Sequence, residues 1–320
     1  MTLLTTSAEV RVPATSANLG PGFDTLGVAL GMHDTITARL VGDGVRVKVT
    51  GEGAGELPTD ERHLIADVML ETLAQLGERP EGIELTCRNH IPQARGLGSS
   101  SAAIVAGIML ARQLVKDGPS LLDDAAVIRQ AAKREGHPDN VSACVLGGFT
   151  IAWIRDQEFS NDGAHAIKIE DANGVVPIAF VPVHRVFTAQ ARAVLPTNVP
   201  LVDAAFNAAR VATLIRAITK RPELLFDSTE DRLHQSYRAT AMPETAALVA
   251  DLRDKGIAAV VSGAGPSVLA LIPSDERLVK DAQRKCPDGW YARELEVDNE
   301  GAKIKAISSR VSQRDRTFAR

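Results

Sequence analysis

The chain has few of the features that mark secreted, membrane-spanning or metal-binding proteins. Only 3 of its 320 residues are cysteines, and Cys87, Cys144 and Cys286 show no metal-ligand spacing, which predicts reduced thiols. The N-terminus has no basic segment followed by a long apolar run, as a secretory signal would. The longest apolar stretch, near residues 102–111, is too short to span a bilayer. We therefore expect a soluble, cytoplasmic protein with no membrane partner.

The chain also lacks an excess of positive charge. Its formal net charge is −4 at pH 7, which argues against nucleic acid as a partner. Hydrophobic residues make up 45% of the chain and charged residues 24%, a balance typical of globular proteins. A chain of 320 residues is long enough for a substantial core and predicts two domains.

Several familiar catalytic motifs are absent as well. No Gly-x-x-x-x-Gly-Lys occurs, which excludes a P-loop nucleotide site. Ser101 stands where the third glycine of the dinucleotide-binding fingerprint would be, so that fold is excluded too. Neither His-Glu-x-x-His nor Cys-x-x-Cys is present, and nothing else in the sequence indicates a zinc site.

What the chain does contain is three glycine-rich turns, each placed after a predicted strand. They are residues 16–24 (SANLGPGFD), 96–102 (GLGSSSA) and 262–267 (SGAGPS). The central turn leads into an alanine-rich apolar run that predicts a helix up to Arg112. Glycines let a backbone approach a ligand closely, and a helix N-terminus offers unpaired N–H groups and the positive end of its dipole. That combination suits phosphate, although an ordinary loop before a buried helix has the same sequence features.

Strands and helices are predicted in a mixed order without regular βαβ alternation, which indicates an α+β fold. Residues 35–40 and 45–50 are predicted to form a hairpin around Gly42-Asp43-Gly44. Ser228 and Asp231 are predicted to form a capping box for a helix over 228–240. Further helices are predicted at 62–76, 121–135, 203–219, 243–255 and 274–285, and further strands at 9–14, 83–88, 149–154, 177–183, 257–261, 268–272 and 290–297.

The composition becomes polar and irregular between Arg155 and Val175, where we predict a domain boundary. The expected N-terminal domain covers residues 1–165 and the C-terminal domain residues 166–307. Residues 308–320 are basic and polar, and are predicted to be a disordered tail.

Taken together, the three turns resemble the motifs of the GHMP kinases. Pro92-x-x-x-Gly-Leu-Gly-Ser-Ser-Ser-Ala102 is similar to the phosphate-binding signature of that family, and Ser262-Gly-Ala-Gly-Pro-Ser-Val268 resembles its third motif. Residues 13–27 (PATSANLGPGFDTLG) resemble its first motif, and the order and separation of all three also match. The resemblance implies the two-domain GHMP kinase fold. That fold has a ribosomal S5 domain 2-like N-terminal domain and a ferredoxin-like C-terminal domain, with the site between them.

The resemblance further implies ATP-dependent transfer of a phosphoryl group to the hydroxyl of a small molecule, with Mg²⁺. The sequences of the first motif and of residues 136–140 (GHPDN) resemble the form of the family that favours L-homoserine as the acceptor. The implied product is O-phospho-L-homoserine, for threonine biosynthesis. Two alternatives stay open, a family kinase with a mevalonate-type substrate and a non-catalytic member that only binds ligand. A homodimer is also implied.

For ATP, the resemblance implies that backbone amides of residues 96–101 hold the triphosphate. Ser100 is implied to contact Mg²⁺, with Glu135 at the end of the following helix as a second ligand. Arg95 and Lys133 could add positive charge near the phosphates. The candidate ATP-binding residues are Pro92, Gln93, Ala94, Arg95, Gly96, Leu97, Gly98, Ser99, Ser100, Ser101 and Ala102.

Homoserine is a zwitterion, so its pocket needs cations for the carboxylate and acceptors for the ammonium. Arg192 and Arg238 match substrate arginines of the family, and a guanidinium can bind a carboxylate through two hydrogen bonds. Asp24 matches a partner for the ammonium or the hydroxyl. The remaining candidates for substrate binding are Asn18, His137, Asn140, Gly263 and Gly265, the two glycines through their backbone amides.

The candidate catalytic residues are Asp139, Asn140 and Arg192. Asp139 lies near the position where some GHMP kinases place an aspartate that deprotonates the attacking hydroxyl. A loose transition state needs little help from a base. Both a base and an orienting role therefore stay open for Asp139.

Overall fold

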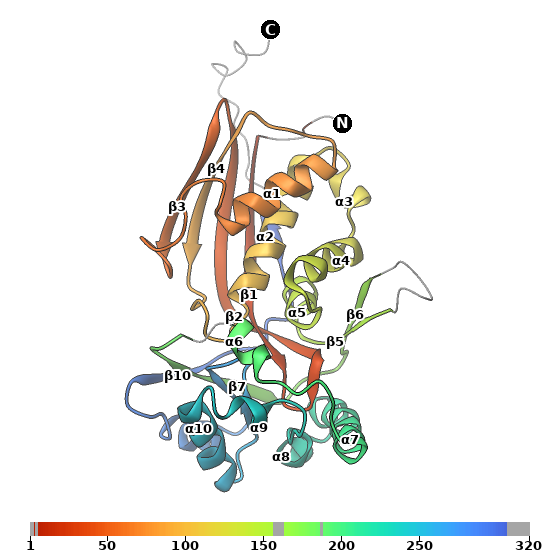
Figure 1. Cartoon of the computed structure of the whole chain (residues 1–320), viewed down its shortest axis with the longest axis vertical. Coiled ribbons are helices and arrows are strands. Elements are labelled where there is room, and N and C mark those ends of the chain that lie inside the picture. Colours follow the sequence, from red (N-terminus) through yellow and green to blue (C-terminus); the bar gives the residue numbers. More distant parts are fainter. Residues whose placement is uncertain (1–2, 4–5, 156–162, 186–187, 306–320) are drawn as a thin grey trace.

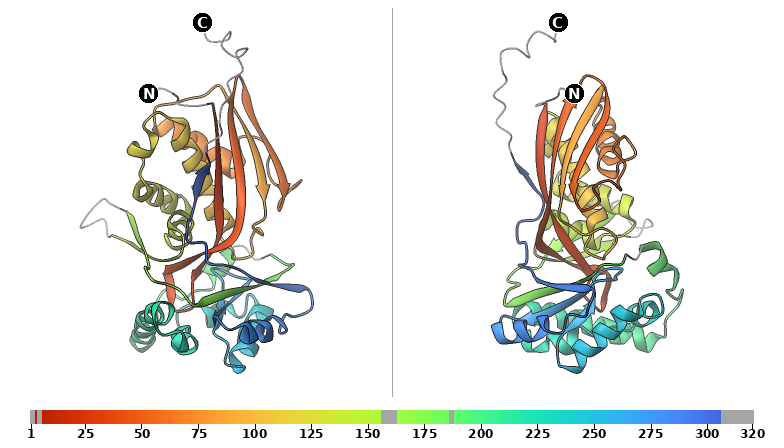
Figure 2. Two further views of the ribbon diagram at one scale, coloured as in Figure 1. Left: turned by 180° about the vertical axis from the view of Figure 1, so that it is seen from behind. Right: turned by 90° about the vertical axis from the view of Figure 1, so that its left-hand side faces the viewer.

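The computed structural model describes residue 3 and residues 6–155, 163–185 and 188–305. The predicted tail at 308–320 lies outside the described residues. Figure 1 shows an elongated molecule with one large sheet in its upper part and a smaller sheet in its lower part. Helices cover one face of the large sheet, as the side view in Figure 2 shows.

The large sheet has seven strands. Its main path runs β11-β1-β2-β4-β3, and β5 pairs with β2 and with β6. The strands are β1 (Ser7–Asn18), β2 (Gly22–Val41), β3 (Gly44–Gly51), β4 (Gly82–Asn89), β5 (Phe149–Ile154), β6 (Ala164–Lys168) and β11 (Lys303–Lys305). The helices against it are α1 (Leu64–Gln75), α2 (Ser99–Leu114), α3 (Gly118–Leu121), α4 (Asp124–Glu135) and α5 (Asp139–Leu146).

Helix α2 is the centre of this upper half. It contacts β1, α1, α4 and α5, and eleven of its residues are buried. The small residues Ala106 and Gly107 allow neighbours to approach closely, since a Cβ at Gly107 would lie 2.9 Å from the carbonyl oxygen of Ile65. Its alanine-rich sequence therefore fits a helix that is enclosed on several sides.

The hairpin predicted around residues 42–44 is wrong. β4 lies between β2 and β3, antiparallel to β2 and parallel to β3. The chain thus passes from β3 to β4 through α1 instead of turning back on β2. A Gly-Asp-Gly turn signal is local, whereas the pairing of β4 depends on burying Ile83, Leu85 and Cys87, which are fully covered.

The smaller sheet is antiparallel, in the order β10-β7-β9-β8. Its strands are β7 (Val175–Pro182), β8 (Ala259–Val261), β9 (Val268–Pro273) and β10 (Trp290–Glu294). The helical segments of this half are α6 (Thr188–Ala193), α7 (Leu201–Thr219), η1 (Pro222–Leu224), α8 (Leu225–Ser228), α9 (Gln235–Arg238), α10 (Pro243–Asp254) and α11 (Glu276–Gln283). The chain therefore changes sheets between β6 and β7.

The single helix predicted over 228–240 is also wrong, because α8 and α9 are separate short helices. Asp231 causes the break. Its carboxylate accepts four hydrogen bonds of 2.8 to 3.0 Å, from the backbone N–H groups of Leu233, His234 and Gln235 and from the side-chain amide of Asn207. Ser228 takes no part in the predicted capping box, since its hydroxyl donates to the carbonyl oxygen of Leu225.

The turn between β1 and β2 joins the two halves of the molecule. His234 Nε2 lies 2.8 Å from the carbonyl oxygen of Gly20, which can only accept, so Nε2 carries the proton. Asn207 donates to the carbonyl oxygen of Pro21 at 3.1 Å. A Cβ at Gly20 would lie 2.4 Å from the carbonyl oxygen of Thr229, so this position requires glycine. The tip of the long β1–β2 ribbon is thereby fixed in the lower half (Figure 1).

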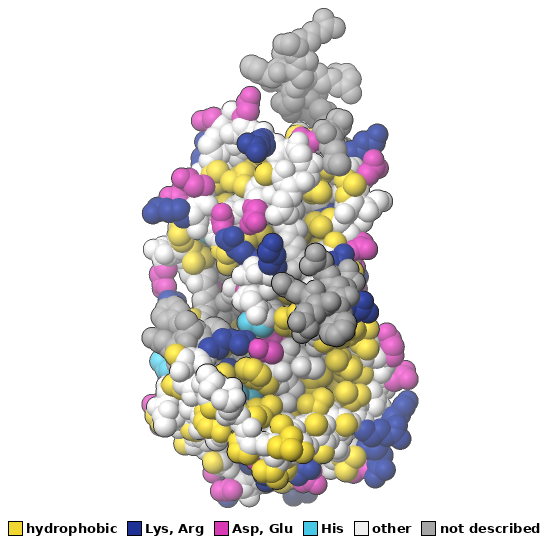
Figure 3. Space-filling model, turned by 45° about the vertical axis from the view of Figure 1, so that its right-hand side comes forward, with side chains coloured by type: hydrophobic (Ala, Val, Ile, Leu, Met, Phe, Trp, Pro, Cys, Tyr) yellow, Lys and Arg dark blue, Asp and Glu magenta, His cyan; other side chains and the backbone are white. Residues whose placement is uncertain are grey.

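One face of the lower half is apolar. Figure 3 shows hydrophobic side chains gathered there. Leu201 and Val202, at the start of α7, are 85% and 67% exposed. Side chains of this size are seldom left so exposed together without a binding partner.

We expect Asp231→Ala to lower the free energy of unfolding by about 3 kcal/mol, because it leaves four partly buried N–H groups without an acceptor. Asp123 caps α4 with one hydrogen bond at an exposed site. Asp123→Ala is therefore the control, with an expected loss of about 1 kcal/mol. Urea denaturation of both variants measures the difference, and equal losses would contradict the role given to Asp231.

The same carboxylate predicts a pH dependence. Burial raises the pKa of Asp231, but the adjacent His234 and the hydrogen bonds outweigh burial, and the pKa is lowered overall. A carboxyl with a lowered pKa stabilises the fold above its ordinary pKa and loses that contribution as the pH falls through its folded-state pKa. The wild type should thus lose stability more steeply than Asp231→Ala below about pH 4.

Candidate active site

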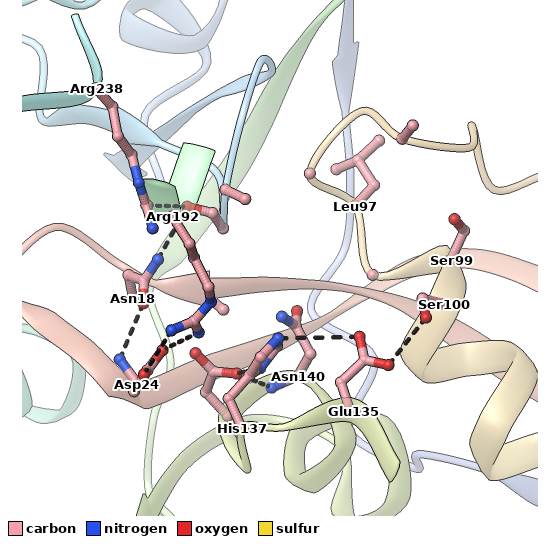
Figure 4. Close-up of a pocket in the computed structure, with 17 residues that line it drawn as sticks. Asn18, Asp24, Leu97, Ser99, Ser100, Glu135, His137, Asn140, Arg192 and Arg238 are labelled. Carbon is pink, nitrogen blue, oxygen red and sulfur yellow. Dashed lines mark hydrogen bonds and ion pairs between the residues drawn. The ribbon is translucent and has the colours of Figure 1, made fainter. Parts of the chain in front are cut away.

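All three glycine-rich turns border one pocket, which Figure 4 shows. The β1–β2 turn, the loop before α2, the start of α5 and the loop after β8 all contribute to it. Its polar or glycine lining residues are Asn18, Asp24, Gly96, Gly98, Ser99, Ser100, Glu135, His137, Asp139, Asn140, Arg192, Arg238 and Gly263. The first and last of these residues are more than two hundred positions apart in the sequence, and the fold brings them together.

Direct hydrogen bonds hold the three turns together. The backbone N–H of Thr15 donates to the carbonyl oxygen of Leu97 at 3.0 Å. Ser262 Oγ donates to the carbonyl oxygen of Gly96 at 2.6 Å. The N–H of Gly263 donates to the carbonyl oxygen of Ala17 at 3.2 Å. The first motif, the central loop and the third motif thus form one rigid wall of the pocket.

Two glycines of the central loop are required by this contact. Gly96 and Gly98 both have φ of +71°, a left-handed conformation that other residues rarely adopt. A Cβ at Gly96 would lie 2.2 Å from the carbonyl oxygen of Ser262, and one at Gly98 would lie 1.9 Å from Thr15 Oγ1. The glycines serve close backbone packing as well as access to a ligand.

The N-terminus of α2 opens into the pocket at Ser99 and Ser100. Gly98 is its N-cap residue, and no side chain caps the helix. The N–H of Ala102 bonds back to the carbonyl oxygen of Gly98, so the N–H groups of the preceding serines have no partner within the helix. Together with the dipole of a helix of 16 residues, they favour an anion such as phosphate.

Glu135 lies opposite this helix start, at the end of α4. Its two carboxylate oxygens accept hydrogen bonds of 2.9 Å each from Ser100 Oγ and Ser101 Oγ. A carboxylate and a hydroxyl beside a phosphate-binding helix N-terminus are the oxygen donors that Mg²⁺ prefers. Ser100 and Glu135 therefore fit the predicted metal role, and Ser101 orients the carboxylate.

His137 and Asp139 form a buried pair at the start of α5. His137 Nδ1 lies 2.6 Å from Asp139 Oδ1, and the same oxygen accepts the backbone N–H of Asn140 at 2.7 Å. Burial lowers the pKa of His137, but the hydrogen bond and the negative charges of Asp139 and Glu135 outweigh burial, so the pKa is raised. One oxygen of Asp139 is thus occupied by two donors.

Asp24 and Arg192 form the second charged pair. Arg192 Nη1 and Nη2 donate to the two carboxylate oxygens of Asp24, at 3.1 and 2.6 Å. The backbone N–H of Asp24 donates to Asn18 Oδ1 at 3.0 Å, and both residues have positive φ, +51° and +68°. Non-glycine residues in this conformation are held there by their surroundings, often at functional sites. Oxygen or nitrogen atoms of Asp24, His137 and Asp139 also lie within 4.8 Å of one another, where a cation would fit.

Arg238 reaches the pocket from α9 and is only 1% exposed. Its guanidinium donates to the carbonyl oxygens of Ala191 and Gly263 and to His234 Nδ1, at 3.0 to 3.2 Å. Among the described residues, no carboxylate lies within 4.0 Å of it. Burial and the charge of Arg192 lower the pKa of Arg238 to about 10, which leaves it cationic at neutral pH. The pocket therefore contains a buried cation that lacks an anionic partner.

Several predicted site residues lie elsewhere. Arg95 donates to the carbonyl oxygens of Gln93, Pro182 and Val183, so it ties the central loop to the end of β7 instead of facing a phosphate. Lys133 does not line the pocket. Of the predicted ATP-binding stretch, Ala94, Gly96, Leu97, Gly98, Ser99 and Ser100 line the pocket, and Pro92, Gln93, Arg95, Ser101 and Ala102 do not.

The two glycines of the third motif also differ from expectation. The N–H of Gly263 is bonded to Ala17 and that of Gly265 to the carbonyl oxygen of Ser262, so neither amide is free for a substrate. Gly263 lines the pocket and Gly265 does not. The role of Gly263 is instead to accept, through its carbonyl oxygen, hydrogen bonds from Asn18 and Arg238.

Sequence reasoning missed Thr15 and His234. Thr15 Oγ1 donates to Asn140 Oδ1 at 2.8 Å, and its place within the first motif was the available signal. His234 links Arg238 to Gly20, and no pattern in the sequence indicated it.

Comparison with known proteins places the chain in a family. Models of the GHMP kinase N-terminal and C-terminal domains match residues 63–148 and 209–292. The homoserine kinase of Streptomyces avermitilis is 51% identical over 303 residues, which cover 95% of this chain and 97% of the relative.

Solved structures of homoserine kinases are also similar to this chain. The homoserine kinase of Cytophaga hutchinsonii superposes with a TM-score of 0.79 at 26% identity, covering 95% of this chain and 99% of that one. A putative homoserine kinase of Listeria monocytogenes gives 0.72 at 31% identity, covering 94% and 99%. The predicted α+β fold is confirmed. The chain belongs to the GHMP kinase family and, within it, to the homoserine kinases.

Proposed function

We propose that this protein transfers the γ-phosphoryl group of ATP to the hydroxyl of L-homoserine, giving O-phospho-L-homoserine for threonine biosynthesis. The observation that carries the proposal is the buried guanidinium of Arg238, which has no carboxylate within 4.0 Å among the described residues, in a pocket whose opposite wall is the N-terminus of α2. A buried cation without an anion is unfavourable, and the carboxylate of an amino acid would supply one.

The charges of the pocket suit the rest of the amino acid. Asp24 keeps lone pairs free while Arg192 holds it, and it can accept the substrate ammonium. With its carboxylate at Arg238 and its ammonium at Asp24, homoserine would extend its hydroxyl toward Asn140 and Ser100. Every charge of the zwitterion would thereby meet an opposite charge.

ATP would place its phosphates at the free N–H groups at the start of α2. Ser100 and Glu135 would hold Mg²⁺, which neutralises negative charge on the phosphates when it is bound. The side chains present therefore supply an anion site and a cation site next to each other.

Asp139 is proposed to orient its neighbours instead of acting as a base. Its Oδ1 already accepts hydrogen bonds from His137 and from the backbone of Asn140. Phosphoryl transfer with a loose transition state depends mainly on position and charge. We therefore infer that reaction proceeds without a dedicated base.

Two other functions fit less well. A mevalonate-type substrate has no ammonium, so it would make no use of the carboxylate lone pairs that Arg192 leaves free on Asp24. A protein that only binds ligand has no need of Ser100 and Glu135 beside an anion site. An ADP-release assay with Mg-ATP and homoserine, mevalonate or a panel of sugars separates the three. Turnover with homoserine alone is expected, and turnover with none of them would overturn the proposal.

No helix among the described residues is long and apolar enough to cross a bilayer. A homodimer stays a prediction, supported by the exposed Leu201 and Val202 at the start of α7, and sedimentation velocity would test it.

Arg238→Lys keeps the charge but removes the second donor arm of the guanidinium. We expect the KM for homoserine to rise about 10- to 100-fold, with the KM for ATP within about twofold. Arg253→Lys, at a partly buried arginine outside this pocket, is the matched control and should change neither constant. Equal increases for both substrates would contradict a role in binding the carboxylate.

Glu135→Gln removes a negative charge but retains the shape of the side chain. The Mg²⁺ concentration that gives half-maximal activity should rise about tenfold or more, because one charged oxygen ligand is lost. The KM for homoserine should stay nearly constant. Asp124→Asn, at the other end of α4, serves as the control. An unchanged Mg²⁺ dependence would remove Glu135 from the metal site.

Asp139→Asn should lower kcat by about 10- to 100-fold without abolishing turnover, less than the loss of a true general base would cause. The pKa of His137, followed by NMR, should fall, because the carboxylate that raises it is gone. Complete loss of turnover, with homoserine binding and fold intact, would show that Asp139 is the base.

A further inference from the structure

Thr15 is fully buried, yet its side chain lies where the two sides of the pocket meet. Its hydroxyl donates to Asn140 Oδ1 at 2.8 Å, and its backbone N–H donates to the carbonyl oxygen of Leu97 at 3.0 Å. The same hydroxyl oxygen occupies the space that a Cβ at Gly98 would need. Thr15 therefore touches both the phosphate-binding loop and the start of α5.

The hydrogen bond from Thr15 holds one end of the Asn140 side-chain amide in place. The backbone N–H of Asn140 is bonded to Asp139 Oδ1, and its side-chain oxygen is occupied by Thr15. The Nδ2 group is the part of this side chain that remains available, and Asn140 lines the pocket. Figure 4 shows it between His137 and Glu135. Asn140 can thus offer N–H donors to a group bound in the pocket.

We propose that Thr15 is a positioning residue for phosphoryl transfer. It holds the Asn140 amide so that Nδ2 donates to the oxygens of the phosphoryl group as that group passes from ATP to the acceptor. An inverted amide would turn its carbonyl oxygen toward the same anionic group, which is repulsive. A hydrogen-bond donor that is already in position lowers the activation barrier of phosphoryl transfer, because the side chain does not have to reorient during the reaction.

The inference rests on the proposed function, since it concerns the group being transferred. Its contribution should appear in the transition state more than in the binding of either substrate. Thr15 does not line the pocket, so it would act only through Asn140 and the loop at Gly98. Its removal should therefore change kcat more than KM.

The experiment compares Thr15→Val, which keeps the shape but loses the hydroxyl, with Thr15→Ser, which keeps the hydroxyl. For Thr15→Val we expect kcat to fall about 10- to 100-fold, with the KM for ATP and homoserine changed less than about threefold. Thr15→Ser should stay within about threefold of the wild type. If the valine variant does not fold, Thr15→Ala, which introduces no new bulk, takes its place.

Thr72 offers a matched control, because it is a fully buried threonine whose hydroxyl is hydrogen-bonded to the side-chain amide of Gln130 at 2.7 Å, outside the pocket. Thr72→Val should lose a similar amount of thermal stability but keep kcat. A double-mutant cycle completes the test, since Thr15→Val should have little further effect on kcat in an Asn140→Ala background.

Three results would overturn the inference. They are a wild-type kcat in Thr15→Val, a fall in kcat of the same size in Thr72→Val, and an undiminished fall in kcat when Thr15→Val is added to Asn140→Ala. Absence of homoserine phosphorylation by the wild type would instead overturn the proposed function. The two failures are therefore distinguishable.

Discussion

The arrangement of the pocket depends on how closely three backbone turns can approach one another. Gly96 packs on the carbonyl of Ser262, and Gly98 packs on the hydroxyl of Thr15, at distances that no Cβ would allow. These contacts aim the first turn of α2 into the pocket and attach the third motif, from the lower half of the molecule, to the upper half. If the contact were loosened, the anion site and Arg238 would no longer be held in a fixed relation. The glycines thus set the distance between the start of α2 and Arg238.

The electrostatics of the pocket follow from that geometry. Arg192 is already paired with Asp24, whereas Arg238 has carbonyl oxygens and an imidazole as its partners. His234 can accept from Arg238 only because its other nitrogen donates to the β1–β2 turn, which fixes the tautomer. The same histidine therefore joins the ribbon of the upper half to the buried cation of the lower half. A carboxylate entering the pocket would complete this chain of partners.

Local patterns predicted the site better than they predicted the strand order. The three turns, Ser100 and the two arginines could be chosen from the sequence because they match positions of the family. Glu135 could be chosen because it is the acid at the end of the following helix. The hairpin at 42–44 and the helix over 228–240 failed because β4 inserts between β2 and β3 and because Asp231 takes four donors. The first failure has a non-local cause in strand pairing. The second is mainly local, since three of the four donors to Asp231 are backbone N–H groups two to four residues later. Arg95 does not line the pocket because its guanidinium meets the end of β7, which lies far away in the sequence.

The hydrogen bonds around Asp139 and Asn140 also bear on how such a site accelerates its reaction. A base needs a free lone pair near the proton that it removes, and two donors already occupy Asp139 Oδ1, which leaves Oδ2 as the oxygen of this carboxylate that could accept a proton. An amide that is held on both its backbone and its oxygen loses the freedom to adapt, which favours it as a fixed donor. His137 and Asp139, which could carry protons, are thus hydrogen-bonded to each other, and Asp139 also holds the backbone of Asn140. That distribution is expected where the barrier is lowered by fixed charge and position, and where a deprotonated alcohol is not required before the phosphoryl group departs.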